Sequence, residues 1–215
     1  MADAPRYPLL ALSRLRMATD GEGVTTLAAG AGCPLRCRWC LNKRLLAEKQ
    51  PEWVTPEELF ARTRIDDLYF QATGGGLCFG GGEPLLYPHF IAAFRQLTGG
   101  VWRLTAETSL CAPTEALTAV LSCLDAFIVD IKSMDEAVYR RYTGGDPAPM
   151  KRNLRLLAET VPPEKVRVKV PLIPGYNDAA DQQNSVRLLR DMGYTRIETF
   201  EYVIKNGGRG REGLS

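Results

Sequence analysis

Short apolar runs alternate with amphipathic stretches along most of the chain, from Val24 onward. Runs that are β-branched or apolar throughout predict strands, whereas apolar side chains that recur every three or four residues predict helices. The pattern predicts strands over residues 24–28, 77–79, 102–106, 126–130, 166–172 and 195–202, and a further strand near 10–17. Helices are predicted from residue 55 onward and over residues 88–97, 113–121, 135–142, 149–160 and 178–192.

The order of these elements indicates the fold class. About six strand–helix units with short loops are typical of an α/β protein in which helices cover a parallel sheet. Periodicity leaves two arrangements open, an open doubly wound sheet and an incomplete barrel. We expect one domain over residues 1–215, with a Gly-rich tail over 205–215 that is mobile in isolation.

The sequence also marks where one helix begins. Thr55 is a residue type that caps helix N-termini, and Pro56 suits the first helical position. Glu57 and Glu58 follow, and their charges suit the positive end of a helix. The helix is therefore predicted to start directly after Thr55.

Composition and charge narrow the function classes. The 215 residues are 45% hydrophobic and 24% charged, which is usual for a globular protein and argues against disorder. The net charge of +2 argues against a protein that mainly binds nucleic acid. Since His89 is the only histidine, sites that need two histidine ligands are excluded. No apolar run approaches a membrane span, and residues 1–20 lack the apolar core of a signal peptide, so we expect a cytoplasmic protein.

Three of the six cysteines lie within eight residues, in the spacing CxxxCxxC: Cys33, Cys37 and Cys40. Because they follow a predicted strand on one loop, their thiolates can converge on one metal centre. A four-iron, four-sulfur cluster ([4Fe–4S]) with three cysteine ligands keeps one iron open to a substrate or cofactor. The alternative is a structural zinc ion, although such sites usually pair two cysteine motifs. Its fourth ligand would be one of Cys78, Cys111, Cys123 or His89.

A second candidate segment is Gly-Gly-Gly-Glu-Pro over residues 80–84, directly after a predicted strand. Glycine lets a ligand approach the backbone closely, and Glu83 adds a carboxylate where ligands of α/β folds bind. Taken alone, such a segment is often a plain loop. Gly30 and Gly32 begin like a dinucleotide-binding GxGxxG fingerprint, but the third glycine is missing and Pro34 follows. We therefore reject that reading.

These residues together resemble the radical S-adenosylmethionine (radical SAM) enzymes and, within them, the activases of glycyl radical enzymes. The CxxxCxxC spacing with Trp39 before the last cysteine is the hallmark of the superfamily, and Gly81, Gly82 and Glu83 match its amino-group-binding motif. The activase resemblance extends over most of the chain through the following segments: Asp20, Gly21, Glu22 and Gly23; Asn42; Asp130, Lys132 and Asp135; Tyr142 to Gly144; and Pro174 to Asp178.

The resemblance implies an incomplete (β/α)6 barrel and a radical mechanism. Cys33, Cys37 and Cys40 would hold the [4Fe–4S] cluster, whose open iron would bind S-adenosylmethionine. Reductive cleavage would give methionine and a 5′-deoxyadenosyl radical, which would remove a Cα hydrogen from a glycine of a partner enzyme. The implied partners are a glycyl radical enzyme and a flavodoxin- or ferredoxin-type electron donor. We expect a monomer that binds neither nucleic acid nor membrane.

The resemblance also implies roles for individual residues. Gly81, Gly82 and Glu83 would receive the cofactor's amino group, and Asp130 and Lys132 would bind its charged end. Trp39 is assigned to cofactor binding as well. Glu107, Thr108 and Asp130 would hold a monovalent cation near the cofactor carboxylate, with Glu107 one methylene longer than the family's Asp. The segment from Asp20 to Gly23 would contact the partner's loop.

The chain also departs from many activases. No cysteine lies between Leu41 and Val54, where many activases carry a ferredoxin-like insert, so one cluster is expected. A family histidine near the last strand has no counterpart, because Val203 follows Tyr202 there, and Arg209 or Arg211 is a candidate replacement. Cys78, Cys111 and Cys123 are expected to be small buried residues, and His89 to be structural.

Two alternatives stay open. One is a radical SAM enzyme that acts on a small molecule or peptide, which the short tail and the missing insert would permit. The other is a zinc-stabilised binding module without catalysis. Colour distinguishes the second, because a reconstituted iron–sulfur protein is brown and a zinc protein is colourless.

Overall fold

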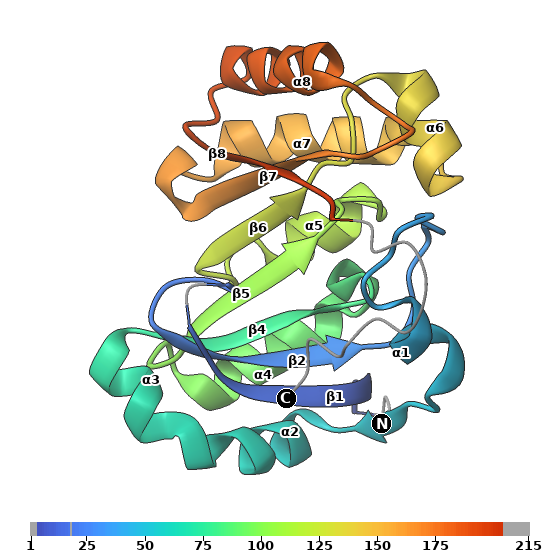
Figure 1. Cartoon of the computed structure of the whole chain (residues 1–215). Helices are drawn as coiled ribbons and strands as arrows, with labels where there is room; N and C mark the ends of the chain where they lie inside the picture. Colours follow the sequence, from blue (N-terminus) through green and yellow to red (C-terminus); the bar gives the residue numbers. More distant parts are fainter. Residues whose placement is uncertain (1–3, 18, 204–215) are drawn as a thin grey trace.

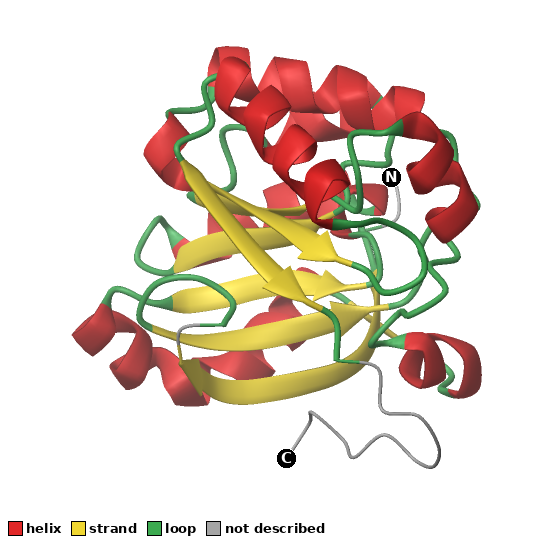
Figure 2. Cartoon of the chain, turned by 45° about the horizontal axis from the view of Figure 1, so that its top comes forward, coloured by secondary structure: helices red, strands yellow, loops and turns green. Residues whose placement is uncertain are grey.

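The structure is a computed structural model that describes residues 4–17 and 19–203, in which one curved sheet carries most helices along one face (Figures 1 and 2). The order of its eight strands is β3-β1-β2-β4-β5-β6-β7-β8. Six successive strands are parallel: β2 (Val24–Gly30), β4 (Gly76–Gly81), β5 (Arg103–Thr108), β6 (Ala126–Asp130), β7 (Val166–Leu172) and β8 (Arg196–Glu201). Two antiparallel strands extend the β2 side: β1 (Tyr7–Met17) and β3 (Glu52–Val54).

Helices fill the connections between the parallel strands. The α-helices are α1 (Lys43–Glu48), α2 (Pro56–Thr63), α3 (Asp67–Thr73), α4 (Pro88–Thr98), α5 (Thr114–Val120), α6 (Glu136–Thr143), α7 (Pro147–Thr160) and α8 (Ala179–Asp191). Short 3-10 turns are η1 (Arg64–Asp66), η2 (Pro84–Leu86) and η3 (Pro163–Lys165). No helix among the described residues is long and apolar enough to cross a bilayer.

The two faces of the sheet differ in chemistry. On the helix-covered face, Phe79 of β4 packs edge-on against Phe90 and Phe94 of α4, with ring centroids 6.3 and 5.6 Å apart. Successive strand residues point to opposite faces, so Cys78 points the other way, where it lies beside Leu27 in a small separate apolar cluster. We call the face that carries Cys78 the inner face.

The strand registers bring the candidate segments to one end of the sheet. Gly30 at the end of β2 is aligned with Gly81 at the end of β4. The cysteine segment and the Glu83 segment therefore leave the sheet side by side. Thr108 and Asp130 lie at the corresponding ends of β5 and β6. The carboxyl ends of parallel strands are where ligands of α/β folds bind.

The predicted α/β class and the six predicted parallel strands are confirmed, with helices in the five connections between them. β3 and β8 stand at opposite ends of the strand order, so the described sheet is an incomplete barrel. The helix start at Thr55 is also confirmed, because Thr55 Oγ1 accepts from the amide of Glu58 at 3.2 Å and Glu58 Oε2 accepts from the amide of Thr55 at 2.7 Å. The predicted tail over 205–215 lies outside the described residues, and the single domain stays a prediction.

Candidate active site

The cysteine loop, residues 31–42, is tied to the end of β4. The backbone amides of Gly82 and Glu83 donate to the carbonyls of Gly30 and Gly32, at 2.9 and 2.8 Å. The side-chain amide of Asn42 donates to the carbonyl of Gly81 at 2.9 Å. Both ends of the loop therefore rest on the glycine segment.

The middle of the loop is tied to α6. The amide of Arg36 donates to the carbonyl of Thr143 at 2.8 Å, and that of Arg38 donates to the carbonyl of Tyr142 at 3.2 Å. An open cleft of about 930 Å³ lies between the loop, α1 and α6. Five basic side chains line it together with Cys37 and Cys40: Arg36, Arg38, Lys43, Arg140 and Arg141.

The three clustered thiols differ in burial. Cys33 is exposed, whereas Cys37 and Cys40 are half-buried. Burial raises the pKa of Cys37 to about 12, and the nearby Lys132 charge opposes the rise. Iron ligation needs thiolates, so a bound metal would have to displace this proton. Within residues 4–17 and 19–203, no three His, Cys, Asp or Glu side chains are already grouped to hold a metal ion.

Three unpaired buried polar atoms lie near Cys37 of this loop. Of the buried side-chain polar atoms in the described residues, four lack a hydrogen-bond partner, and three of them are Asp130 Oδ1, Tyr139 Oη and Tyr142 Oη. Burial raises the pKa of both tyrosines, and the nearby Cys37 thiol adds to the rise. Such atoms are costly to bury without a partner. Three thiols together with orphaned polar atoms fit a sulfur-ligated cluster with a polar cofactor beside it.

Glu83 is held inside the fold by four donors. It is 2% exposed, and its carboxylate accepts from Thr108 Oγ1 at 2.6 Å and from the Ser109 amide at 2.9 Å. Ser109 Oγ donates at 2.6 Å and the Leu85 amide at 3.2 Å. Burial raises the pKa of Glu83, and the hydrogen bonds from Ser109 and Thr108 oppose that rise. Glu83 therefore fixes the loop after β4 against the end of β5.

Asp130 and Lys132 form a pair at the end of β6. The Lys132 ammonium donates to Asp130 Oδ2 and, at 2.9 Å, to Tyr202 Oη just after β8. Burial would lower the pKa of Lys132, but the charge of Asp130 outweighs it and the pKa is raised. The pair therefore presents a positive group and a free carboxylate oxygen next to Cys37.

Of the three residues predicted to hold a monovalent cation, Glu107 and Asp130 share the inner face of the sheet, whereas Thr108 does not. Glu107 Oε1 accepts from Lys169 Nζ of β7 at 2.9 Å. Thr108 points to the other face of β5, where it donates to Glu83. Asp130 is paired with Lys132. These side chains do not fit a shared cation.

The segment from Asp20 to Gly23 lies at the amino ends of the parallel strands. Asp20 is 2% exposed and pairs with Arg16 of β1. The Gly21 backbone passes so close to Thr105 of β5 that a Cβ there would meet its Oγ1 at 3.3 Å. Glu22 pairs with Arg103 and Arg196 at 2.6 and 3.1 Å, which lowers the pKa of Glu22.

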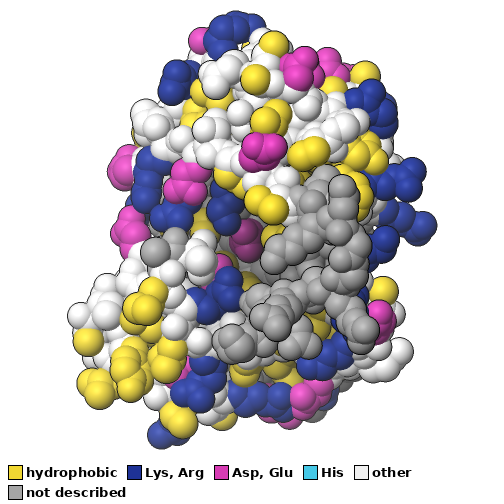
Figure 3. Space-filling model, viewed as in Figure 1, with side chains coloured by type: hydrophobic (Ala, Val, Ile, Leu, Met, Phe, Trp, Pro, Cys, Tyr) yellow, Lys and Arg dark blue, Asp and Glu magenta, His cyan; other side chains and the backbone are white. Residues whose placement is uncertain are grey.

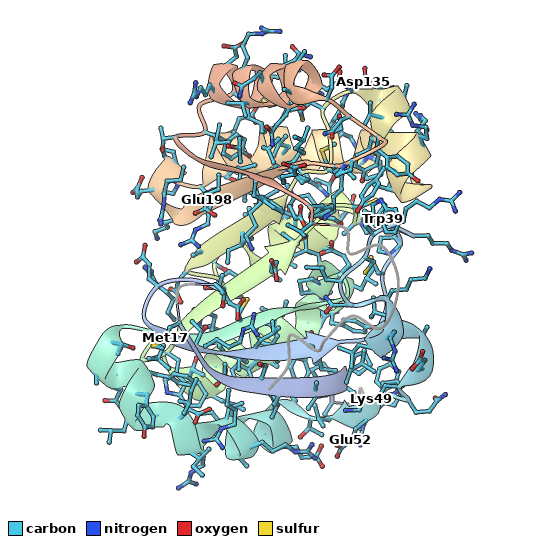
Figure 4. The ribbon with its side chains drawn as sticks, viewed as in Figure 1. Met17, Trp39, Lys49, Glu52, Asp135 and Glu198 are labelled. Atoms are coloured by element: carbon cyan, nitrogen blue, oxygen red, sulfur yellow. The ribbon has the colours of Figure 1, made fainter. Side chains whose placement is uncertain are left out.

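The labelled side chains make this arrangement visible. Figure 4 shows Met17 and Trp39 at opposite ends of the strands. The segment from Asp20 to Gly23 and the cysteine loop therefore lie at opposite ends of the sheet. Charged side chains of both signs gather in the hollow in front of the strands (Figure 3). Trp39 itself is 43% exposed.

Sequence reasoning missed several residues that shape the site. Ser109 secures Glu83 through two hydrogen bonds, Tyr202 contacts Lys132, and Lys169 contacts Glu107. Their partners are 26, 70 and 62 residues away in sequence. The alternation of β7 could have placed Lys169 on one face of the sheet, but nothing local identified its partner.

Comparison with protein families agrees with this site. The family model of the radical SAM superfamily matches residues 28–189, which include the cysteine loop and the strands β4 to β7. The chain therefore belongs to the radical SAM superfamily. The predicted incomplete-barrel fold is that of the superfamily and is confirmed.

Curated relatives are activating enzymes. The (2S)-3-sulfopropanediol sulfolyase activating enzyme of Bilophila wadsworthia is 25% identical, over 85% of this chain and 81% of its own length. The (2S)-3-sulfopropanediol dehydratase activating enzyme of Klebsiella oxytoca is 34% identical, over 74% of this chain and 69% of its own length. The pyruvate formate-lyase 2-activating enzyme of Escherichia coli is 27% identical. The predicted family, that of the glycyl-radical-enzyme activases, is confirmed.

Solved structures support the fold. Streptococcus suis SuiB bound to S-adenosylmethionine has a TM-score of 0.63 at 13% identity and covers 81% of this chain. This chain spans 39% of that protein. TYW1 with a lysine-pyruvate adduct has a TM-score of 0.60 at 18% identity, and this chain spans 65% of it.

Proposed function

We propose that this enzyme activates a glycyl radical enzyme by using a [4Fe–4S] cluster and S-adenosylmethionine. The observation that carries the proposal is that three unpaired buried polar atoms, from Asp130, Tyr139 and Tyr142, lie near Cys37 of the three-cysteine loop. The superfamily implies both the cluster and S-adenosylmethionine, and several relatives are named as activating enzymes. Identities of 25 to 34% support the class of reaction, whereas the particular partner remains open.

When bound, the cluster and cofactor supply a 5′-deoxyadenosyl radical that removes the Cα hydrogen of a glycine. The chain's own residues would position these groups. Cys33, Cys37 and Cys40 would ligate three irons as thiolates. Asp130 Oδ1, free of other partners, and the Lys132 ammonium are suited to the cofactor's charged end. The aromatic Trp39 would flank the site.

Glu83 would act through the backbone that it holds. Its carboxylate already accepts four hydrogen bonds from the protein. Those bonds fix the loop that follows Gly81 and Gly82, so their backbone groups are held ready for the cofactor's amino group. Ordered donors and acceptors cost less to reorganise when the ligand binds.

The inner face is where a partner's glycine loop would enter. Asp20 and Gly21 fold over this face at the end opposite to the cysteine loop. A peptide that lay along the inner face would reach the cysteine loop and the accessible residues 21–23, whereas Asp20 would act by fixing this turn through Arg16. This supports contact between the partner and the segment from Asp20 to Gly23, which the resemblance predicts.

The remaining partners are also proposals. The basic cleft beside Cys37 and Cys40 suits an acidic flavodoxin- or ferredoxin-type donor, because opposite charges steer association. A single cluster and a monomeric state stay predictions. The monovalent cation also stays a prediction, and the pairing of Glu107 with Lys169 weighs against it.

Anaerobic reconstitution tests the cluster and the cofactor. We expect about four irons and four sulfides per chain, and 5′-deoxyadenosine on addition of dithionite and S-adenosylmethionine. Cys37→Ala should lose both, because one of three ligands is gone. The matched control Cys123→Ala should keep both, since Cys123 lies in the apolar core. A colourless protein with one zinc per chain would instead support the binding module.

A further inference from the structure

A lysine pairs with Glu107, one of the residues that the family resemblance assigns to a monovalent cation. Lys169 lies on β7, directly across from Asp130 of β6. Its side chain reaches past β6 to Glu107 of β5, where Nζ donates to Oε1 at 2.9 Å. Lys169 is 21% and Glu107 30% exposed, so both partners are largely withdrawn from water.

The sheet register places the Lys169 ammonium near both carboxylates, although among the described residues it is hydrogen-bonded only to Glu107. Glu107 is aligned with Ile128 on β6, and Ile128 and Asp130 share a face because they are two residues apart. Lys169 therefore extends from a position beside Asp130 toward Glu107. The longer Glu side chain, compared with the family's Asp, helps Glu107 meet the lysine.

The charges of this group are already balanced. Glu107 and Asp130 are the two carboxylates, and the ammonium groups of Lys169 and Lys132 pair with them. Burial would lower the pKa of Lys169, but the charges of Glu107, Asp130 and Asp20 outweigh it, so its ammonium stays protonated at neutral pH. A metal ion would have to displace an ammonium from a carboxylate and would lie against a like charge.

We propose that the Lys169 ammonium replaces the monovalent cation, so that the chain binds S-adenosylmethionine without Na⁺ or K⁺. The inference rests on the proposed function. It makes Lys169 a positioning residue that supplies fixed positive charge beside the cofactor site. A fixed lysine is available at any salt composition, whereas a bound ion depends on its concentration.

The first test is cofactor affinity. Isothermal titration of the anaerobically reconstituted enzyme with S-adenosylmethionine is compared in potassium chloride and in tetramethylammonium chloride, at equal ionic strength. The two dissociation constants should agree within about twofold. An affinity that rises about tenfold in potassium would overturn the inference. Absence of binding in both salts would instead contradict the proposed function.

The second test removes the lysine. Lys169→Met should weaken cofactor binding about tenfold in tetramethylammonium, and potassium should restore part of the loss. The matched control Arg167→Met changes another inner-face cation on β7, one paired with Glu198, and should show neither effect. A Lys169→Met enzyme whose affinity is unchanged, or is lost equally in both salts, would contradict the replacement.

A direct count of bound ions covers the case in which Lys169→Met does not fold. Thallium(I) stands in for potassium, and its binding to the unaltered enzyme with S-adenosylmethionine is followed by thallium NMR and by metal analysis after gel filtration. The inference predicts no stoichiometric thallium. About one tightly held thallium per chain would refute it.

Discussion

Replacing Gly82 with alanine tests how the sheet holds the cysteine loop. A Cβ at this position would overlap the carbonyl oxygen of Gly32 and would lie 3.0 Å from the carbonyl oxygen of Gly30. Both neighbours are backbone atoms at the start of the cysteine loop. They cannot swing aside as the end of a flexible side chain would, so the loop itself must shift.

The expected cost follows from the contacts that the shift breaks. The carbonyl of Gly32 accepts from the amide of Glu83 at 2.8 Å, and pushing it away loses that bond, at about 1 kcal/mol. Forcing a methyl group into a packed site costs a further amount of about 1–3 kcal/mol. The total of about 2–4 kcal/mol is a large share of the stability of a typical domain.

The assay pairs unfolding with cluster content. Urea denaturation gives the free energy of unfolding, and iron analysis after reconstitution reports whether Cys33, directly after Gly32, still reaches the metal. Gly80→Ala is the matched control, because its Cβ would lie 3.1 Å from Leu27 Cδ1, which can move, and 3.4 Å from Glu107 Cβ. It should cost under about 1 kcal/mol and keep its iron.

Gly82→Ala is therefore expected to lose both stability and iron, and Gly80→Ala neither. If the two variants were equally stable and bound equal amounts of iron, the contact between the glycine segment and the cysteine loop would not organise the site. Loss of stability with full iron content would also contradict the reasoning, because the loop would then be independent of the sheet.

Two further predictions concern buried carboxylates. Burial raises the pKa of Glu83, so the folded chain binds this proton more tightly than the unfolded chain does, and stability is lost as the pH rises from 4.5 through the raised pKa. In urea denaturation, the free energy of unfolding of the unaltered chain should therefore fall with rising pH relative to that of Glu83→Gln. A difference that stays constant or grows would refute this. Asp20→Asn should weaken glycine activation in a partner protein, measured by the glycyl radical signal, at least about tenfold. Cofactor cleavage without the partner, measured as 5′-deoxyadenosine, should be unchanged. An equal loss of both activities would contradict a role of Asp20 in partner recognition.

Much of the fold could be predicted because its signals are local. The capping box at Thr55 and Glu58 is encoded within four residues, and β6 is a short apolar run that ends at Asp130. The short elements α1, β3 and α3 were missed. β3 has three residues, and it exists because Val54 aligns with Tyr7 at the edge of β1, a pairing that no local pattern reveals. α1 has no buried residue to give it a periodic apolar face.

In the candidate site, too, locally encoded features could be predicted from the sequence and distant pairings could not. The spacing of Cys33, Cys37 and Cys40 places three thiols on one loop, and their role as cluster ligands stays a prediction. The cation site was assigned by position along the chain, and the structure separates Thr108 from its other two members. Strand alternation turns Thr108 toward Glu83, and Lys169, 62 residues away, pairs with Glu107. Pairings across a sheet depend on the strand register, which no local sequence pattern reveals.

The most direct test of the central claim is electron paramagnetic resonance on a partner protein. The reconstituted enzyme is reduced with dithionite, given S-adenosylmethionine and mixed with the glycyl radical enzyme encoded nearest to its own gene, with its glycines deuterated at Cα in a parallel sample. The account predicts a glycyl radical signal and transfer of deuterium into 5′-deoxyadenosine. Formation of 5′-deoxyadenosine with neither signal nor deuterium would contradict it and would favour a small-molecule or peptide substrate.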